Sequence, residues 1–382
     1  MSEEKYAERL SDAAAGIVRG TLDVVRAHAG EVAGVFYGSL FAAHPGLTDL
    51  FNQADQASGT QRAALAAAVV GFAEHLVDPT SEEFAPAERI AQKHVSLGVP
   101  PGLYPVVGDH LIAAVGTVLA VPPEVAAAWR EVYDLFAARL TAREERLFAA
   151  AGVQAISAWR PWRVAKRHEE AVDAVSFTLV PDDGGPVPAF RPGQYVSVSV
   201  ELPDGRRQPR QYSLSRGPRG DSLRITVRRV PGGAVSGFLH DHVRPDAVLL
   251  VGPPAGEVVL EPGPDPVVLI SAGIGVTPMA AILDHVARTE PERPVVAVHV
   301  EHSADRHALR DECAAAGSLL ADYREIRWNG RAEVDPAAIP LPPEAWYHLC
   351  GPVPFMADLW AALVGRGVPA DRIRREVFGP TR

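Results

Sequence analysis

One histidine lies where a metal ligand could be. In the stretch AERIAQKHVSLG, residues 87–98, Ile90, His94 and Leu97 recur at the spacing of a single helix face. A neutral imidazole on such a face can coordinate a metal ion. Packing of a hydrogen-bonded histidine into a helical core explains the same pattern and is the commoner outcome. This stretch alone therefore leaves both interpretations open.

A glycine turn between a strand and a helix could hold a ligand. Residues 267–283 read VVLISAGIGVTPMAAIL, in which Gly273 and Gly275 allow a ligand to approach the backbone closely. Pro278 suits the first turn of the helix that follows. The full G-x-G-x-x-G fingerprint of dinucleotide sites is not present, so the turn indicates a ligand site without naming the ligand.

Three kinds of pattern follow one another along the chain and must position these residues. Up to about residue 155, apolar residues recur at intervals of three and four residues. This spacing predicts helices at 6–27, 31–43, 61–77, 84–97, 104–120 and 123–150. From about 160, short β-branched runs separated by Pro, Gly and Asp clusters are typical of an antiparallel barrel or sandwich. From about 266, strands alternate with helices, which implies a parallel sheet.

The sequence therefore predicts a multidomain chain. We expect an all-α domain at 1–152, an antiparallel β-barrel domain at 153–262 and an α/β parallel-sheet domain at 263–382. The segment AISAWRPWR, residues 155–163, is the expected seam between the helical part and the rest.

Composition narrows the class of protein. The 382 residues are 47% hydrophobic, enough for several domains with their own cores. The net charge of −10 argues against nonspecific nucleic-acid binding. The acidic N-terminus has no apolar signal segment, and no apolar run is long enough to span a membrane. The two cysteines, Cys313 and Cys350, make no disulfide framework, so a cytoplasmic protein is expected.

The helical part resembles the globin domain of flavohaemoglobins. The resemblance is carried by residues 33–65, AGVFYGSLFAAHPGLTDLFNQADQASGTQRAAL. It implies that this part binds haem b, with His94 as the proximal iron ligand and Tyr37 as the distal tyrosine. The other implied pocket residues are Phe51, packed against the haem, and Gln61 and Leu65, which lie four apart on the distal helix and so face the same way.

Two further residues of the helical part match the family. Tyr104, in PPGLYPVVGDHL, and Glu144, in LTAREERLF, are implied to hydrogen-bond around His94. A carboxylate at the ring N–H makes an imidazole a stronger electron donor. From the residues alone, Glu144 lies in the charged run REER, which usually faces solvent. Lys93 could contact a haem propionate or be an ordinary solvated lysine.

The β part resembles the flavin domain of ferredoxin reductase-like enzymes. The strings FRPGQYVSV (190–198) and RQYSLS (210–215) match the P-G-Q-Y and R-x-Y-S motifs of that family. The FAD-binding residues implied by the two motifs are Gln194, Tyr195, Arg210, Gln211, Tyr212 and Ser213. The planar fork of an arginine suits the FAD pyrophosphate. A core aromatic of the barrel is the alternative for Tyr195.

The string GGAVS is a second implied contact to the FAD pyrophosphate. It brings Gly233, Val235 and Ser236 to the start of a short helix, where free N–H groups attract phosphate. A Gly-Gly hairpin turn followed by a capped helix is the plain structural alternative.

The α/β part resembles the nicotinamide domain of the same enzymes, in which the turn GIGVTP matches the G-x-G-x-T-P motif. The resemblance implies a site for NADH or NADPH at Gly273, Ile274, Gly275, Val276, Thr277 and Pro278, and at Cys350, Gly351 and Pro352 of CGPVPFM. Cys350 lies near the nicotinamide or is simply a buried small residue. In the terminal string REVFGPTR, the resemblance implies that Phe378 covers the flavin face and Glu376 lies close to the flavin edge, with Gly379 and Pro380 fixing the turn. Ser303 and Arg306 are candidates for reading the 2′ position, which leaves the choice of coenzyme open.

The resemblance covers almost the whole chain and implies an activity. A flavohaemoglobin of this kind is a nitric oxide dioxygenase, in which NAD(P)H reduces FAD, FAD reduces the haem, and NO and O2 become nitrate. The expected partners are therefore O2 and NO, with no nucleic acid, no membrane span and a monomeric chain. Two other classes stay open at this point. One is a flavin-based NAD(P)H oxidase or ferric, quinone or hydroperoxide reductase, and the other is an O2 or NO sensor.

Overall fold

The structure is a computed structural model that describes residues 9–50, 60–78 and 86–378. These residues form two compact units that divide between Ala158 and Trp159, inside the segment expected to be the seam. The domain limits expected at 152/153 and 262/263 stay predictions.

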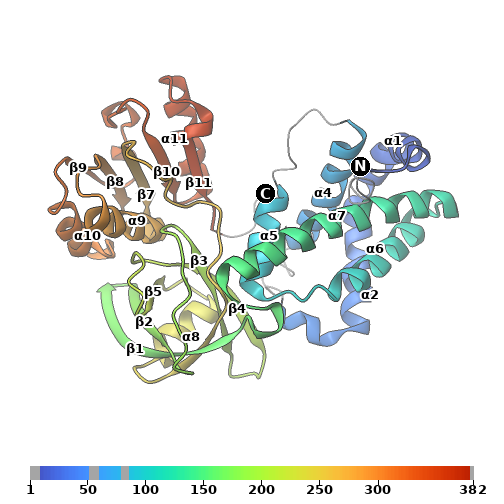
Figure 1. The fold of residues 1–382 in the computed structure, drawn as a ribbon, viewed down its shortest axis with the longest axis horizontal. Helices are drawn as coiled ribbons and strands as arrows, with labels where there is room; N and C mark the ends of the chain where they lie inside the picture. Colours follow the sequence, from blue (N-terminus) through green and yellow to red (C-terminus); the bar gives the residue numbers. More distant parts are fainter. Residues whose placement is uncertain (1–8, 51–59, 79–85, 379–382) are drawn as a thin grey trace. The chain divides into compact units, whose positions relative to one another are not determined.

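The first unit is helical throughout its described residues (Figure 1). Its elements are α1 (Asp12–Ala27), α2 (Ala29–Ala43), η2 (Pro45–Leu50), α4 (Thr60–Val77), α5 (Pro86–Leu97), α6 (Leu103–Leu119), α7 (Pro123–Ala151) and the short η3 (Ala155–Ser157). Prolines open three of these helices, where a missing N–H costs nothing. Gly152 ends the longest one in the left-handed conformation (φ +69°) that glycine adopts without strain.

The start of α1 differs from the expectation of a helix at 6–27. Residues 9–11 are not helical, because Ser11 takes an extended conformation and its hydroxyl accepts the Ala14 N–H at 3.2 Å. The Ser11 hydroxyl also donates to Glu131 of α7 at 2.9 Å. Serine is a preferred N-cap residue, and here it fixes both the start of α1 and its position against α7.

Large apolar side chains from most of these helices meet in one core. Phe36, Phe72, Trp129, Phe136 and Leu140 are all almost completely buried in it. Each side chain of this size stabilises the fold by about 1.5–3 kcal/mol when buried. The core therefore fixes α2, α4 and α7, which also carry residues of the cavity described below.

The second unit begins with a six-stranded antiparallel sheet. Its strands are β1 (Arg160–Ala171), β2 (Ala174–Pro181), β3 (Tyr195–Glu201), β4 (Arg207–Ser213), β5 (Leu223–Arg228) and β6 (Val248–Val251), in the order β4-β3-β6-β1-β2-β5. Helix α8 (Ala234–His242) packs against β4 and β5. The buried faces of the strands form a second hydrophobic core that includes Trp162 and Phe177.

A five-stranded parallel sheet follows, in the order β11-β10-β7-β8-β9. Its elements are β7 (Val267–Ala272), η4 (Gly273–Gly275), α9 (Val276–Thr289), β8 (Val295–Glu301), η5 (Ala304–Arg306), α10 (Arg310–Gly317), β9 (Tyr323–Asn329), η6 (Arg331–Glu333), η7 (Pro336–Ala338), β10 (Trp346–Cys350), α11 (Val353–Gly365), η8 (Ala370–Arg372) and β11 (Ile373–Glu376). Successive residues of β7 alternate between the two faces, so Val268 packs with α11 and Leu269 packs with α9. Figure 1 shows α9 and α10 on one face and α11 on the other.

One expected helix is interrupted. The sequence predicted a helix from about 305 to 317, but the structure has η5 at Ala304–Arg306 and α10 at Arg310–Gly317. Leu309 between them is buried and adopts a left-handed backbone conformation (φ +61°), which does not occur inside an α-helix and therefore separates the two segments. Apart from these local differences, the all-α, antiparallel β and parallel α/β parts occur in the expected order.

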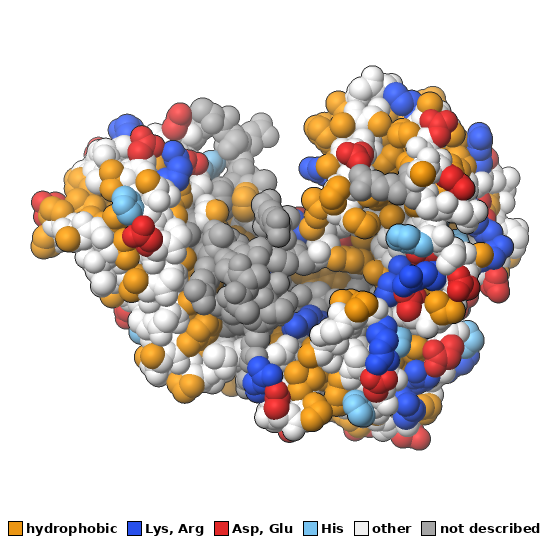
Figure 2. Space-filling view, turned by 180° about the vertical axis from the view of Figure 1, so that it is seen from behind, with side chains coloured by type: hydrophobic (Ala, Val, Ile, Leu, Met, Phe, Trp, Pro, Cys, Tyr) orange, Lys and Arg blue, Asp and Glu red, His pale blue; other side chains and the backbone are white. Residues whose placement is uncertain are grey.

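The surface is mixed in charge where it can be seen. On the described residues of the face in Figure 2, basic side chains alternate with acidic ones. Among the described residues, no helix is both long and apolar enough to cross a membrane.

Candidate cofactor sites

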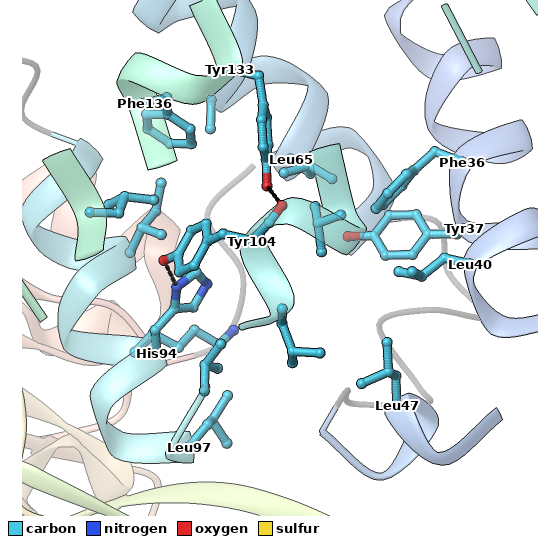
Figure 3. Close-up of a pocket in the computed structure, with 17 residues that line it drawn as sticks. Phe36, Tyr37, Leu40, Leu47, Leu65, His94, Leu97, Tyr104, Tyr133 and Phe136 are labelled. Atoms are coloured by element: carbon cyan, nitrogen blue, oxygen red, sulfur yellow. Dashed lines mark hydrogen bonds between the residues drawn. The ribbon is translucent and has the colours of Figure 1, made fainter. Parts of the chain in front are cut away.

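A cavity of about 230 Å³ opens between the helices of the first unit (Figure 3). Its walls come from α2, α4, α5, α6 and α7 and are mostly apolar. They are formed by Phe36, Tyr37, Leu40, Leu47, Leu65, Ala68, Ile90, Lys93, His94, Leu97, Val99, Leu103, Tyr104, Val107, Tyr133, Phe136 and Leu140. The expected residues Tyr37, Leu65, Lys93, His94 and Tyr104 are thus brought to one cavity.

His94 is held by two partners through one ring nitrogen. Its Nδ1 lies 2.8 Å from Oε1 of Glu144 and 2.9 Å from the hydroxyl of Tyr104. The Tyr104 hydroxyl in turn donates to the same carboxylate oxygen at 2.5 Å. Because Nδ1–H donates to a carboxylate, Nε2 is the unprotonated nitrogen and keeps its lone pair. No described residue hydrogen-bonds this Nε2, so it is available to a ligand in the cavity.

Glu144 is a buried carboxylate, with a 1% exposed surface, although its neighbours in REER are charged. Its second oxygen, Oε2, has no hydrogen-bond partner among the described residues. Burial and then the Glu144 charge raise the pKa of Tyr104 well above its ordinary value, so the phenol stays protonated and can donate. The solvated-face interpretation of Glu144 is therefore wrong, and its hydrogen bond to His94 is as the resemblance implied.

Neighbouring residues fix the position of this arrangement. Tyr133 donates to the Tyr104 carbonyl at 2.7 Å, and its ring packs so closely on Gly108 that a Cβ there would lie 2.5 Å from it. Arg143 makes a bidentate ion pair with Glu88. This pair connects α7 with α5, the helix that carries His94. This hydrogen bond lowers the pKa of Glu88 against the opposing effect of burial.

The opposite wall of the cavity carries Tyr37. Its side chain is buried, and Figure 3 shows its hydroxyl directed into the space between α2 and His94. Leu65 lies on the same side, on α4. Of the other expected distal residues, Phe51 lies outside the described residues, and of Gln61 only the helical backbone is described.

The described residues fit a haem held by one histidine. A protein haem site needs an imidazole nitrogen facing an apolar slot and a fixed tautomer. His94 supplies the nitrogen, Glu144 fixes the tautomer, and the apolar cavity walls supply the slot.

The two flavin motifs lie side by side in the antiparallel sheet. Strands β3 and β4 are paired so that Tyr195 faces Ser213 and Val198 faces Arg210. The Gln211 amide donates to the Ser197 hydroxyl at 3.1 Å, and Gln194 accepts the Arg191 N–H at 2.8 Å. The Arg210 guanidinium donates to the Pro209 carbonyl at 2.7 Å and to the Gln208 side chain at 3.1 Å. Motifs that are 15 residues apart in sequence thus form one surface.

Tyr195 and Tyr212 are both held by their surroundings. Close to the Tyr195 ring lies Gly256, where a Cβ would come within 3.1 Å. Burial raises the pKa of Tyr212 well above its ordinary value. Ser213 is buried at the end of β4.

The start of α8 is open to an anion. Gly233 is the N-cap residue and has no side chain to satisfy the first N–H groups of the helix. The Ser236 hydroxyl turns back to accept the Val230 N–H at 3.1 Å, and Val235 is buried. A helix start of this kind binds phosphate, so the residues present fit the FAD pyrophosphate. The structural alternative was a Gly-Gly turn followed by a capped helix. A turn does lead into α8, but Gly233 gives the helix no side-chain cap.

The predicted glycine turn forms η4 at the carboxyl end of β7. Gly273 adopts a left-handed conformation (φ +56°), and a Cβ on Gly275 would lie 2.3 Å from the Cys350 carbonyl. Thr277 donates from its hydroxyl to the Ile274 carbonyl at 2.9 Å and is buried, as are Val276 and Pro278. The turn therefore needs glycine for both its conformation and its contact with β10.

The ends of β10 and β11 lie next to this turn. Cys350 pairs in register with Ser271 of β7 and with Glu376 of β11, and it is completely buried. Burial, and then the Glu376 charge, raise the pKa of the Cys350 thiol well above its ordinary value. Gly351 and Pro352 lead from it into α11. Phe378 is 43% exposed, which leaves its ring accessible to a flavin, whereas Gly379 and Pro380 lie outside the described residues.

The candidates for the 2′ position have partners within the chain. Arg306 pairs with Asp173 at 2.6 Å, and the Ser303 hydroxyl bonds to Asp305. Asp173 also lies 3.4 Å from Arg228, whose Nη2 is 2.6 Å from the buried Glu301. Sequence reasoning missed this Asp173–Arg228–Glu301 group, because its members come from three strands or turns that are distant in the chain.

Tyr133 is the other functional residue that the sequence analysis missed. A signal for the buried face of α7 was present, since Phe136, Leu140, Glu144 and Phe148 recur four apart. That spacing places Glu144 on the apolar face, and extending it one turn back points to the region of Tyr133.

Comparison with known proteins gives the class and then the family. A model of the globin family matches residues 34–140. A crystal structure of a flavohemoglobin from Malassezia yamatoensis with bound FAD and heme has a TM-score of 0.89 and is 30% identical, and the match covers 97% of this chain and 100% of that one. The FAD/NAD-binding domain of a nitric oxide dioxygenase from Vibrio cholerae is 34% identical over 58% of this chain and 99% of that one, with a TM-score of 0.55. The chain is thus a globin joined to a flavin- and nicotinamide-dependent reductase fold.

Full-length relatives make the assignment specific. The flavohemoprotein of Deinococcus radiodurans is 39% identical, and the match covers 96% of each chain. That of Bordetella pertussis is 40% identical over 97% of this chain and 98% of its own. The chain belongs to the flavohaemoglobin family.

Proposed function

We propose that this chain is a nitric oxide dioxygenase that converts NO and O2 to nitrate, with electrons from NADH or NADPH. The observation that carries the proposal is the His94–Glu144–Tyr104 set on one side of an apolar cavity that also contains Tyr37. A protein that only stores oxygen has no need of an attached reductase, and this chain has one.

The chain's residues have separate tasks at the haem site. A haem bound here would supply an iron site for a diatomic ligand. His94 would hold the iron through Nε2, and Glu144 and Tyr104 orient the ring and would make it a stronger donor. Tyr37 would donate a hydrogen bond to a ligand in this cavity, whose apolar walls keep out water. Phe51, Gln61 and Lys93 are proposed to complete the site by resemblance.

The reductase residues hold the electron carriers. FAD bound here would supply the chemistry of hydride acceptance and single-electron transfer. Arg210 and the start of α8 at Gly233 bind its pyrophosphate, and Tyr195, Tyr212 and Ser213 lie along the flavin. Phe378 covers the flavin face, and the turn Gly273–Gly275 admits the phosphates of the nicotinamide coenzyme.

The proposal also covers the small-molecule partners, the oligomeric state and the cellular compartment. The small-molecule partners are O2 and NO, and the chain acts as a monomer. Its two cysteines are both free, which suits the reducing cytoplasm. Light scattering after size-exclusion chromatography tests the monomer, since a mass of twice 40.8 kDa would contradict it.

The experiment that tests the function measures nitrate. Protein loaded with haem and FAD is supplied with NADH, O2 and NO, and we expect one nitrate per NO consumed. In His94→Ala this conversion should be lost, while the reduction of ferricyanide by NADH persists. Consumption of NO without nitrate would overturn the proposal, and so would an undiminished nitrate yield in the variant.

A further inference from the structure

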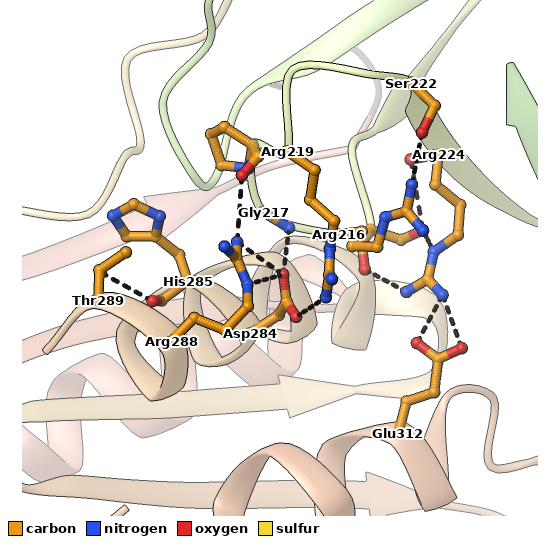
Figure 4. Close-up of polar contacts among 12 residues, drawn as sticks. Arg216, Gly217, Arg219, Ser222, Arg224, Asp284, His285, Arg288, Thr289 and Glu312 are labelled. Atoms are coloured by element: carbon orange, nitrogen blue, oxygen red, sulfur yellow. Dashed lines mark hydrogen bonds and ion pairs between the residues drawn. The ribbon is translucent and has the colours of Figure 1, made fainter. Parts of the chain in front are cut away.

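A second cavity, of about 460 Å³, lies within the reductase unit (Figure 4). It is bounded by the connection between β4 and β5 and by helices α9 and α10. Its lining consists of Arg216, Arg219, Arg224, Ala280, Asp284, Ala287, Arg288, Glu312, Cys313, Ala315, Ala316 and Leu319. None of these residues belongs to the flavin or nicotinamide sites proposed above. A volume of this size is within the range of small-molecule sites, about 300–1,000 Å³.

The charged side chains of this lining are unequal in number. Four are arginines and two are carboxylates, which leaves two positive charges in excess. Asp284 accepts hydrogen bonds from Arg219 at 2.7 Å, from Arg288 at 3.2 Å and from the Gly217 N–H at 3.0 Å. Glu312 accepts hydrogen bonds from Nη1 of Arg224, at 2.7 Å through Oε1 and at 2.5 Å through Oε2. Figure 4 shows both carboxylates engaged in this way.

Arg216 is the one arginine of this lining that neither Asp284 nor Glu312 pairs with. Its guanidinium bonds to the Ser222 hydroxyl at 2.6 Å, and among the described residues its nearest carboxylate is the largely exposed Asp221 at 4.0 Å. Burial, together with the positive charges of Arg224 and Arg219, lowers the pKa of Arg216. Ion pairs that fasten α9 and α10 to the barrel explain Arg219 and Arg224, but they do not explain Arg216.

Several N–H groups at the cavity have no acceptor among the described residues. They are Nε and Nη1 of Arg216, Nε and Nη1 of Arg219, and Nη1 of Arg288. A guanidinium presents its N–H groups as a planar fork that matches phosphate and carboxylate oxygens. These side chains are partly exposed to solvent, and an anion with several oxygen atoms could engage several of their N–H groups at once.

The remaining wall is apolar and made of small side chains. Ala280 and Ala287 of α9 face Ala315 and Ala316 of α10, and Leu319 completes this wall although it is 61% exposed. Ala315 is exposed as well. Small side chains leave room, and these apolar side chains give an apolar ligand group a surface to pack against. The charged and apolar walls together are complementary to an anion that has a compact apolar body.

We propose that this cavity binds a phosphate monoester with a compact apolar body, held through its phosphate by Arg216 and Arg219. A phosphate monoester carries about two negative charges at neutral pH, which equals the charge excess of the lining. The apolar body lies against Ala315 and Leu319. Because the arginines 216, 219 and 224 come from the barrel and Arg288 comes from α9, a bound ligand joins the two halves of the reductase unit.

The test uses full-length protein loaded with haem and FAD, with NAD⁺ at saturation so that the nicotinamide site is filled. Phenyl phosphate is titrated by isothermal calorimetry at constant ionic strength, with benzyl alcohol as the uncharged analogue. We expect saturable one-to-one binding of phenyl phosphate and none of benzyl alcohol. Loss of the Arg216 charge in Arg216→Gln should weaken binding about tenfold or more, as is usual for a lost charged hydrogen bond.

Two further variants separate the cavity from general charge effects. Arg324→Gln makes the same charge change at an exposed position of β9 outside the cavity and should bind as the unmodified protein does. Ala315→Trp fills the apolar part without touching an arginine and should abolish binding while the melting temperature stays within a few degrees. Absence of saturable binding in the unmodified protein, equal binding in Arg216→Gln and Arg324→Gln, or unchanged binding in Ala315→Trp would each overturn the proposal.

Discussion

At the scale of residues, the site depends on carboxylates and arginines whose environments differ from what their neighbours in sequence suggest. Glu144 sits in a charged run and is nevertheless buried against His94, whereas Glu145 beside it is exposed. Arg306 stands where a coenzyme phosphate could be read, but it is already paired with Asp173. Both contrasts lead to substitutions, each with the same chemical change at an exposed position as control.

Glu144→Gln removes the negative charge that orients His94 while keeping the shape of the side chain. Because a carboxylate strengthens the donor power of the imidazole, we expect a lower iron–histidine stretching frequency in resonance Raman spectra and a higher haem reduction potential. Turnover should fall about 10–100-fold, the usual effect of losing such a partner. Glu145→Gln should change none of these properties, and an unshifted stretching frequency in Glu144→Gln would show that the carboxylate does not act through His94.

Asp173→Asn should change the choice of coenzyme. In the unmodified protein the Asp173 carboxylate neutralises Arg306 at 2.6 Å, so we expect NADH to be preferred over NADPH. Freeing Arg306 makes it available to a 2′-phosphate, and one such charged contact corresponds to about a tenfold gain in kcat/KM for NADPH. Asp371→Asn, at an exposed position, is the control. A fall in both activities by the same factor would mean that Arg306 does not read the 2′ position.

At the scale of elements, α6 and α7 are held by a contact that only glycine permits. A Cβ on Gly108 would lie 2.5 Å from the ring of Tyr133, the residue that holds the Tyr104 carbonyl. Gly116 lies two turns further along the same helix, with nothing within 4 Å of its Cβ position. The two glycines therefore respond oppositely to the same substitution.

Gly108→Ala should destabilise the helical unit by about 1–3 kcal/mol, the usual effect of overpacking a core. Gly116→Ala should leave stability unchanged or raise it by up to about 1 kcal/mol, because alanine favours a helix. Thermal unfolding followed by haem absorbance gives both values. If Gly108→Ala melted at or above the temperature of Gly116→Ala, the close packing of Tyr133 on α6 would be wrong.

The helices were largely predictable, and the pairing of the strands was not. Proline and capping residues are local signals, and they placed most helix ends within a residue or two of those observed. By contrast, β6 lies between β3 and β1 in the sheet although it is the last of the six strands in the chain. Nothing local in four residues of sequence, VLLV, specifies those two neighbours, because they are set by long-range packing.

The functional residues, too, include some that the sequence predicted and others that only the fold brings together. His94 and Tyr104 are ten residues apart and were connected only by the resemblance. The Asp173–Arg228–Glu301 group and the arginine cavity join residues from separate elements, and only the fold brings them together. The left-handed Leu309 that interrupts one predicted helix was likewise not indicated by the local sequence, because leucine rarely adopts this conformation.

At the scale of the whole molecule, the reductase unit should be the part that acid destabilises, because its parallel sheet buries neutral histidines. Burial is the main cause that lowers the pKa of His299 to about 2, that of His307 to about 4 and that of His348 to about 3. In the unfolded chain a histidine binds a proton near pH 6.5. Between pH 6.5 and these lower values, the unfolded state therefore holds more protons than the folded state, and stability falls as the pH falls.

His348 offers the cleanest measurement of this effect. It is completely buried, and neither ring nitrogen has a hydrogen-bond partner among the described residues. Each such histidine removes about 1.4 kcal/mol of stability per pH unit below 6.5, or about 2 kcal/mol at pH 5. His348→Leu should therefore lose less stability than the unmodified protein between pH 7 and pH 5, by about that amount, when unfolding is followed by the release of flavin fluorescence. His302→Gln alters an exposed histidine, with 87% of its side chain accessible, and is the control. If the free energy of unfolding depended on pH in the same way in His348→Leu and in the unmodified protein, proton uptake by His348 would not be what destabilises the sheet in acid.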